Sequence, residues 1–328
     1  MPIMAAAAGS APAHHDTPPP IFANILDRVG NTPLIRLHLF DHSHPGVEFY
    51  AKAEWFNPGC SVKDRPAKRM IEEAERSGEL TRDKTIIDST SGNTGIGYAL
   101  VAAAKGYRLK LVMPETASRE RVETVRAYGA EIVFSDRLDG SDGAVRLCRQ
   151  MLRESPNDYY YANQYDNPNN PLSHYDTTGP EIIEQTGGRV THFVAGLGSS
   201  GTVMGTGRRL HEFNPAIKVI AVQPTDNFHG LEGLKHIPTA IRPAIYDESV
   251  HDVLLDAETD DAYDLARRVA RSEGILVGHS CGAALWGAAQ VTRGLRGGVV
   301  VMIFPDSGAR YLSKGLYAQA APPGPGNA

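Results

Sequence analysis

The sequence predicts an α/β protein with two open, twisted and mostly parallel β-sheets flanked by helices. Short apolar runs alternate with amphipathic stretches from about residue 21 onward, and this alternation is typical of parallel sheets. The apolar runs are rich in Val and Ile without regular polar alternation, as expected for strands whose two faces are both buried. A length of 328 residues is enough for two domains with separate cores.

The elements follow one another in a regular order. Strands are expected at 47–56, 85–90, 108–114, 131–135, 191–197, 218–224, 275–278 and 299–305. Helices are expected at 61–77, 96–106, 118–129, 202–213, 261–274 and 282–295. The Pro- and Asn-rich segment 163–171 interrupts this order and is the best candidate for a crossing between domains. We therefore expect a smaller, mobile domain at 57–167, and a larger domain formed by 21–56 and 168–316.

The two ends of the chain differ from the rest in composition. Residues 1–20 are rich in Ala, Pro and His, and we expect them to form a disordered tail. Residues 317–328 end in a run of Ala, Pro and Gly and are expected to form a flexible tail.

Composition and charge exclude several classes of function. The net charge of −5 gives no basic surface for nucleic acid, and no apolar run is long enough to cross a membrane. The three cysteines, Cys60, Cys148 and Cys281, lack C-x-x-C spacing, which argues against a disulfide scaffold and against a zinc site. We expect no metal site and a reducing cytoplasmic compartment.

Ligands of such folds bind at the carboxyl ends of strands, where loops lead into helices. The first candidate loop is 57–65 (NPGCSVKDR). Ser61 is expected to cap the following helix, so that Lys63 lies in its first turn, where the helix dipole lowers the pKa of the amine. Such a lysine forms imines readily and, once released, acts as a base. The alternative is a surface lysine paired with Asp64 or with a glutamate of its own helix.

The second and third loops both favour anion binding. Residues 88–95 (DSTSGNTG) are mostly Ser, Thr, Asn and Gly, which suits a substrate carboxylate at a helix N-terminus, although a tight turn with an ordinary cap remains the alternative. Residues 196–202 (GLGSSGT) match G-x-G-x-x-G, but a dinucleotide site requires an acidic residue at the end of the next strand. That strand ends at Gln223 and Pro224. A cradle for a single phosphate is the interpretation that remains.

The fourth loop, 278–282 (GHSCG), matches the G-x-S-x-G pattern of hydrolases. Those enzymes need a histidine later in the chain than the serine, and none follows Ser280. Ser280 is therefore either a helix cap or a polar ligand at the mouth of the sheet.

The sequence resembles the cysteine synthase and cystathionine β-synthase family of fold type II pyridoxal-phosphate enzymes. It is most similar to O-acetylserine sulfhydrylases of the B-type branch. The motifs that carry the resemblance lie at 31–34 (NTPL), 61–65 (SVKDR), 90–95 (TSGNTG), 164–165 (QY), 178–181 (TGPE), 198–202 (GSSGT) and 305–313 (PDSGARYLS). Together they extend over nearly the whole chain apart from the tails.

The resemblance implies a cofactor, pyridoxal 5'-phosphate, and a role for each site residue. Lys63 would hold the cofactor as a Schiff base and then serve as acid and base, while Asn93 would bind the pyridoxal hydroxyl. Ser280 would face the pyridine nitrogen. The cofactor phosphate would be bound by Gly198, Ser199, Ser200, Gly201 and Thr202. The substrate carboxylate would be held by Thr90, Ser91, Thr94 and Gln164.

The implied reaction is replacement of the β-substituent of an activated serine. The leading hypothesis is a cysteine synthase that uses O-acetylserine with sulfide or thiosulfate. The alternatives are a cystathionine β-synthase using serine and homocysteine, and a catalytically idle relative that binds a partner such as the tail of a serine acetyltransferase. The joint presence of Lys63, Asn93 and Ser280 argues against the idle relative. The resemblance also implies a homodimer.

Overall fold

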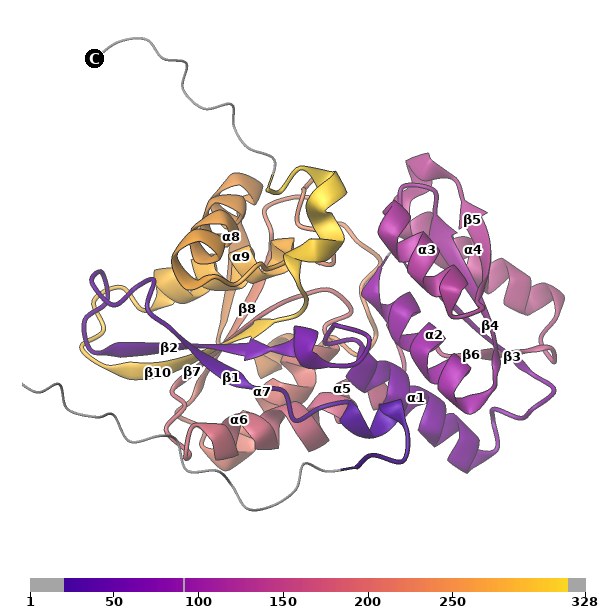
Figure 1. The fold of residues 1–328 in the computed structure, drawn as a ribbon, viewed down its shortest axis with the longest axis horizontal. Coiled ribbons are helices and arrows are strands. Elements are labelled where there is room, and N and C mark those ends of the chain that lie inside the picture. The colour runs from indigo at the N-terminus through magenta and orange to yellow at the C-terminus, as the bar shows by residue number, and fades with distance from the viewer. Residues whose placement is uncertain (1–20, 91, 318–328) are drawn as a thin grey trace, which may run out of the picture.

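The computed structural model describes residues 21–317 apart from Ser91, and it contains two units, each built on one β-sheet (Figure 1). The predicted α/β class with two mostly parallel sheets is confirmed. The predicted tails lie outside the described residues, except for Tyr317. The hydroxyl of Tyr317 donates to the carbonyl of Val277 and accepts from its N–H.

The larger sheet has the strand order β1-β2-β10-β7-β8-β9. Its strands are β1 (Leu34–Leu37), β2 (Val47–Ala53), β7 (His192–Gly196), β8 (Lys218–Pro224), β9 (Val253–Ala257) and β10 (Gly298–Phe304). All neighbouring strands are parallel except β1 and β2, which are antiparallel. The central strands are buried on both faces, in agreement with their Val- and Ile-rich sequences.

Helices cover both faces of the larger sheet. One face packs against α8 (Thr259–Glu273) and α9 (His279–Val291), and the other packs against α6 (Gly179–Gln185) and α7 (Gly201–Phe213). Figure 1 shows α8 and α9 above the sheet and α6 and α7 below it. The loops at the carboxyl ends of β7 and β10 consequently open toward the second unit.

The smaller sheet is entirely parallel, in the order β5-β4-β3-β6. Its strands are β3 (Thr85–Ser89), β4 (Arg108–Pro114), β5 (Glu131–Ser135) and β6 (Tyr159–Tyr161). Helices α2 (Asn93–Lys105) and α3 (Arg119–Ala127) contribute to the core on one face, and α4 (Gly140–Glu154) covers the other. The chain returns to the larger unit through residues 162–168 and enters α5 (Asn169–Ser173).

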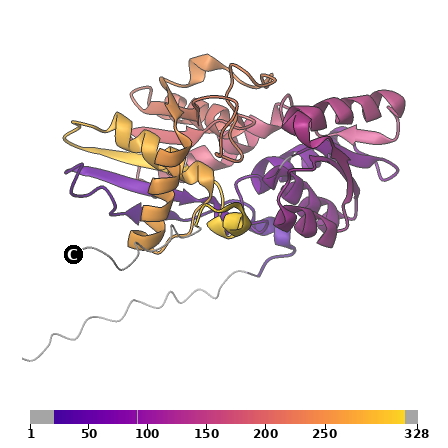
Figure 2. The ribbon, with the colours of Figure 1, turned by 90° about the horizontal axis from the view of Figure 1, so that it is seen from above.

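Helix α1 (Asp64–Ser77) lies where the two units meet (Figures 1 and 2). Its buried residues Ala67, Met70, Ile71 and Ala74 follow the spacing of an amphipathic helix. Gly78 ends the helix in the left-handed conformation, with φ of +79°. The helix packs against α2 on one side and against α5 on the other, so it contacts both units.

Two expectations about local structure are wrong. Residues 275–278 do not form a strand, because the backbone of Val277 bonds to the Tyr317 hydroxyl and makes only one isolated bridge, to Ser307. The first helix begins at Asp64 rather than at Ser61, since residues 61–63 form a turn in which Val62 donates its N–H to the Pro305 carbonyl at 2.8 Å.

Candidate active site

A cavity of about 510 Å³ opens between the two units and is lined by residues from both. Nearly all the predicted site residues line it: Lys63, Thr90, Asn93, Thr94, Gln164, Gly198, Ser199, Ser200, Thr202 and Ser280. Gly201 is the first residue of α7, immediately before Thr202. Ser91, predicted to bind the substrate carboxylate, lies outside the described residues.

Lys63 occupies the position just before the first turn of α1. Its backbone N–H donates to the Ser61 hydroxyl at 3.3 Å, so Ser61 bonds to the start of the helix although it is not part of it. Desolvation by the surrounding protein lowers the pKa of the Lys63 amine. Asp64 does not pair with Lys63: its carboxylate accepts the Gly59 N–H at 2.5 Å. An amine with a lowered pKa that lines a cavity is suited to imine formation and to proton transfer.

The loop after β3 is held in shape by its own hydroxyl groups. Thr90 Oγ1 accepts the N–H groups of Gly92 and Gly95 at 3.1 and 3.2 Å. Thr94 Oγ1 donates to Gln164 Oε1 at 2.8 Å, and Gln164 Nε2 donates to the Ser89 carbonyl at 2.9 Å. The structure therefore brings Gln164, which follows β6, to the loop that carries Thr90 and Thr94.

The loop between β7 and α7 has the properties of a phosphate cradle. Ser200 adopts the left-handed conformation, with φ of +73°, and its buried hydroxyl has no hydrogen-bond partner among the described residues. A side chain at Gly198 would collide with the Gly233 carbonyl, and one at Gly201 with Asn170, so both positions require glycine. The loop leads directly into the N-terminus of the 13-residue helix α7, where free N–H groups attract an anion.

Side chains behind the cradle hold its outer hydroxyl groups. Asn170 Nδ2 donates to Ser199 Oγ at 3.0 Å, and Thr202 Oγ1 lies 3.3 Å from His174 Nε2. His174 also contacts Thr178 Oγ1 at 2.9 Å through its other ring nitrogen. Burial lowers the pKa of His174 to about 3, so this imidazole is neutral at physiological pH.

Ser280 is the second residue of α9, is buried, and lines the cavity. Gly278 is the cap of this helix, so Ser280 is not a cap. The preceding residue, His279, is packed between the rings of Tyr263 and Tyr311, at centroid distances of 5.0 and 4.3 Å. Burial lowers the pKa of His279 to about 4. The wall of the cavity therefore carries the Ser280 hydroxyl, which has no charge, and the neighbouring His279 is neutral as well.

The motif at 305–313 contributes residues to which the sequence assigned no role. Asp306 Oδ2 accepts from Asn93 Nδ2 at 2.6 Å and from the Tyr311 hydroxyl at 2.5 Å. Arg310 donates to Asn93 Oδ1 and to the Gly59 carbonyl. These contacts fix the Asn93 amide and tie the 305–313 segment to the Lys63 loop. The motif itself was visible in the sequence, but its contacts with Asn93 were not.

The part of the chain that the structure describes holds no group of three or more His, Cys, Asp or Glu side chains placed to bind a metal ion. A helix with the length and apolarity that a bilayer demands is also absent from these residues.

Comparison with known proteins agrees with this geometry. The model of the family described as "Pyridoxal-phosphate dependent enzyme" matches residues 25–306. A cysteine synthase of Aquifex aeolicus is 49% identical over 300 residues, which are 90% of this chain and 92% of the relative. Cysteine synthase B of Escherichia coli is 42% identical over 291 residues, covering 89% and 95% of the two chains.

A solved structure shows the same fold. The O-acetylserine sulfhydrylase isoform 3 of Entamoeba histolytica superposes with a TM-score of 0.87 at 37% identity, and the match covers 94% of this chain and 95% of the other. The unpartnered Ser200 hydroxyl, the glycines of its loop and the buried amine of Lys63 fit the phosphate and the aldehyde of this family's cofactor. The chain belongs to the pyridoxal-phosphate dependent enzyme family, as its motifs predicted.

Proposed function

We propose that this protein is a cysteine synthase that replaces the acetate of O-acetylserine with a sulfur nucleophile, either sulfide or thiosulfate. The observation that carries the proposal is a single cavity that gathers Lys63, the cradle at 198–202 and the loop at 90–94. These three features supply an imine-forming amine, a phosphate site and a carboxylate site. The relatives named cysteine synthase support the choice of reaction.

Pyridoxal phosphate, when bound, supplies an aldehyde that condenses with an amine with loss of water, and a ring that accepts electrons. Residues Gly198 to Thr202 would bind its phosphate, and Asn93 would bind the ring hydroxyl. Ser280 would donate a hydrogen bond to the ring nitrogen without supplying a full proton, so the ring would be a moderate electron acceptor. This favours prompt loss of the β-substituent over racemisation.

Protein groups perform the remaining steps. Thr90, Ser91, Thr94 and Gln164 hold the substrate carboxylate and so orient the Cα–H bond. Lys63 would hold the cofactor through its amine and, as a free amine, would remove the α-proton of the substrate. The Cβ–O bond breaks and acetate departs; a Cβ–S bond then forms, and Lys63 returns the proton to Cα. The lowered pKa of Lys63 supports this role, because a neutral amine is needed to accept the proton.

The smaller unit, residues 57–167, moves against the larger one and excludes water during the reaction. The protein acts in the cytoplasm, which the three free cysteines support. It forms a homodimer, which light scattering would detect as twice the 35.4 kDa of one chain.

Serine acetyltransferase is a proposed partner, whose C-terminal tail docks at the mouth of the cavity. Leu138 and Phe228, which are 91% and 93% exposed, line the cavity and would contact such a tail. A peptide with the sequence of the tail is expected to compete with O-acetylserine.

The test is a product assay on the cofactor-loaded protein. O-acetylserine is supplied with sulfide or with thiosulfate, and serine with homocysteine serves as the comparison. With sulfide, we expect acetate and cysteine in equal amounts. With thiosulfate, we expect acetate and S-sulfocysteine in equal amounts. Product only from serine and homocysteine would replace the proposal with cystathionine synthesis, and no product from any pair would exclude both.

A further inference from the structure

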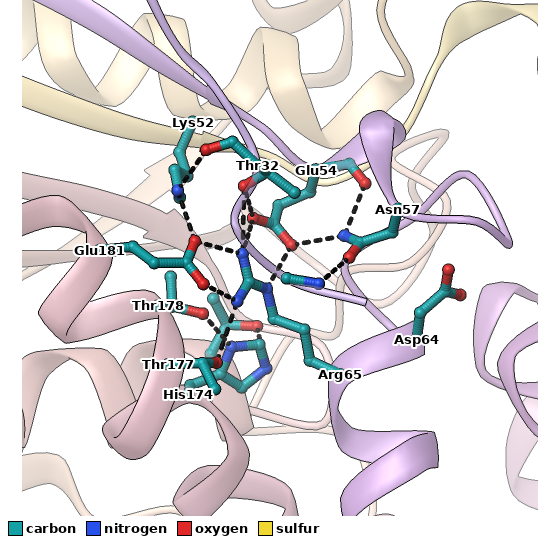
Figure 3. A network of polar contacts seen from close by, with 12 residues as sticks. Thr32, Lys52, Glu54, Asn57, Asp64, Arg65, His174, Thr177, Thr178 and Glu181 are labelled. Atoms are coloured by element: carbon teal, nitrogen blue, oxygen red, sulfur yellow. Dashed lines mark hydrogen bonds and ion pairs between the residues drawn. The ribbon is translucent and has the colours of Figure 1, made fainter. Parts of the chain in front are cut away.

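A cluster of buried charges connects the start of α1 to the larger unit (Figure 3). The Arg65 cluster consists of Thr32, Lys52, Glu54, Arg65 and Glu181. Arg65 follows Lys63 by two residues and lies in the first turn of α1, whereas the other members come from the larger unit. The guanidinium is therefore the point at which the Lys63 segment is attached to the larger sheet.

Arg65 binds two carboxylates at once. Its Nε and Nη2 donate to the two oxygens of Glu54, both at 2.8 Å. Its Nη1 and Nη2 donate to the two oxygens of Glu181 at 2.6 and 2.8 Å. The planar guanidinium fixes direction as well as distance in each of these pairs, which a lysine ammonium cannot do. Figure 3 shows Arg65 between the two glutamates.

The carboxylates are themselves held from the other side. Lys52 Nζ contacts Glu181 Oε2 at 2.6 Å, and the Thr32 hydroxyl donates to Glu54 Oε1 at 2.6 Å. The side chains of Lys52, Glu54 and Arg65 are 0%, 0% and 1% exposed. Arg65 holds the pKa of Glu54 at about 2 despite its burial, so the two cations and two anions balance.

Stability alone is a weak explanation for such a cluster. Buried ion pairs add little net stability compared with well-packed apolar side chains, because desolvation offsets the attraction. What the Arg65 cluster does provide is a fixed orientation of the turn that carries Lys63.

The same arginine also reaches the elements behind the phosphate cradle. Arg65 Nη1 donates to Thr177 Oγ1 at 2.9 Å, in the π-helical turn His174–Thr178. His174, in this turn, contacts Thr202 of the cradle. The Lys63 segment and the cradle are thereby both connected to the Arg65 cluster.

We infer that Arg65 is a positioning residue for Lys63, which sets the distance and angle between the Lys63 amine and the cradle through Glu54, Glu181 and Thr177. The inference rests on the proposed function, in which Lys63 binds the cofactor held by the cradle. Loss of the guanidinium fork therefore slows attachment of the cofactor to Lys63 and lowers kcat, with little effect on KM for O-acetylserine. Displacement of a reacting group by about 1 Å costs on the order of a hundredfold in rate.

The test compares Arg65→Lys with Arg69→Lys. Arg69 lies one turn later on α1 and pairs with Glu73 and Asp176 at 2.9 and 3.0 Å, with its side chain 33% exposed. Each protein is freed of cofactor and mixed with pyridoxal phosphate, and the absorbance band of the lysine-bound cofactor is followed in time. Borohydride reduction and peptide mapping then identify the lysine, and thermal melting shows that each variant is folded.

In Arg65→Lys, the absorbance band is expected to appear about tenfold or more slowly, and kcat is expected to fall by a similar factor. In Arg69→Lys, both quantities are expected to match those of the wild type. Rates for Arg65→Lys within twofold of Arg69→Lys would overturn the inference. If Arg65→Lys does not fold, Thr177→Val decides: it removes the contact of Arg65 with the π-helical turn, together with the hydrogen bond from the Thr177 hydroxyl to the Ser173 carbonyl, and an unchanged rate contradicts the inference. A wild-type protein that forms no adduct at Lys63 would instead overturn the proposed function.

Discussion

Two sets of ion pairs join the units, and they differ in burial. The Arg65 cluster is almost completely enclosed at the base of α1. The mouth pairs, Arg121–Glu232 and Lys235–Asp142, each join a cation that is 5% or 10% exposed to a carboxylate that is 29% or 27% exposed. Arg121 and Asp142 belong to the smaller unit, whereas Glu232 and Lys235 belong to the larger one. Lys314 adds a contact with Glu232 within the larger unit.

This difference indicates which contacts can break during a catalytic cycle. A pair whose carboxylate is partly exposed exchanges its partner for water at a lower cost and is partly screened by salt, whereas separation of fully buried charges is expensive. Opening of the smaller unit would therefore break the mouth pairs and leave the Arg65 cluster intact. Because Arg65 attaches its segment to the larger unit, Lys63 would move less than the substrate loop when the smaller unit opens.

The substitution with the largest expected effect is Lys63→Ala, next to the Arg65 cluster. We expect no absorbance band from lysine-bound cofactor and a loss of kcat of at least about a thousandfold, because nucleophile and base disappear together. Spectra and product assays check this, and Lys68→Ala on the same helix is the control. Turnover at the wild-type rate would exclude Lys63 from catalysis.

Ser280→Asp is expected to have the next largest effect. A carboxylate in this position would favour a protonated ring nitrogen, so the spectrum of the bound cofactor shifts and kcat falls by about tenfold or more. Ser280→Thr keeps the hydroxyl and serves as the matched control. An unchanged spectrum and rate in Ser280→Asp would remove Ser280 from the proposed place.

Glu232→Gln tests the role of the mouth pairs in closure. It weakens the pair with Arg121, which connects the two units, so the closed state is less favoured and KM for O-acetylserine rises a few-fold, with kcat nearly unchanged. Added NaCl is expected to raise KM in the wild type more than in this variant. Glu248→Gln, at an exposed pair with Arg242, is the control. Equal salt dependence in all three proteins would contradict a role of the mouth pairs in closure.

The smallest expected effect concerns Asp64, which is buried beside the Arg65 cluster. Burial raises the pKa of Asp64 from 3.8 to about 7, so the folded protein holds a proton that the unfolded chain releases. This group therefore favours folding at pH 4 and progressively less as pH rises to 7. Asp64→Asn is expected to raise Tm at pH 8 by a few °C more than at pH 5. Melting curves at the two pH values check this, and an equal shift at both would contradict the raised pKa.

Sequence patterns predicted the interior strands better than the edge strands. The expected strands at 108–114 and 218–224 coincide with the interior strands β4 and β8, and the one at 131–135 coincides with the edge strand β5. The three strands absent from the expectation, β1, β6 and β9, are also at sheet edges, where they are short and incompletely buried. A continuous apolar run marks a strand buried on both faces, and these three edge strands lack that signal.

The sequence likewise predicted some features of the candidate site and not others. The lysine loop, the substrate loop and the phosphate cradle are each continuous in sequence, so their residue types indicated them. The contacts of Asp306 with Asn93 and of Arg65 with Glu181 join residues 213 and 116 positions apart. No local pattern contains such pairs, because they arise only when the two units fold against each other.

Attachment of the cofactor to Lys63 underlies both proposals. It is measured by borohydride reduction of the wild-type protein loaded with pyridoxal phosphate, followed by peptide mapping by mass spectrometry. We expect one pyridoxyl adduct per chain, on the peptide that contains Lys63. An adduct on another lysine, or none at all, would contradict it.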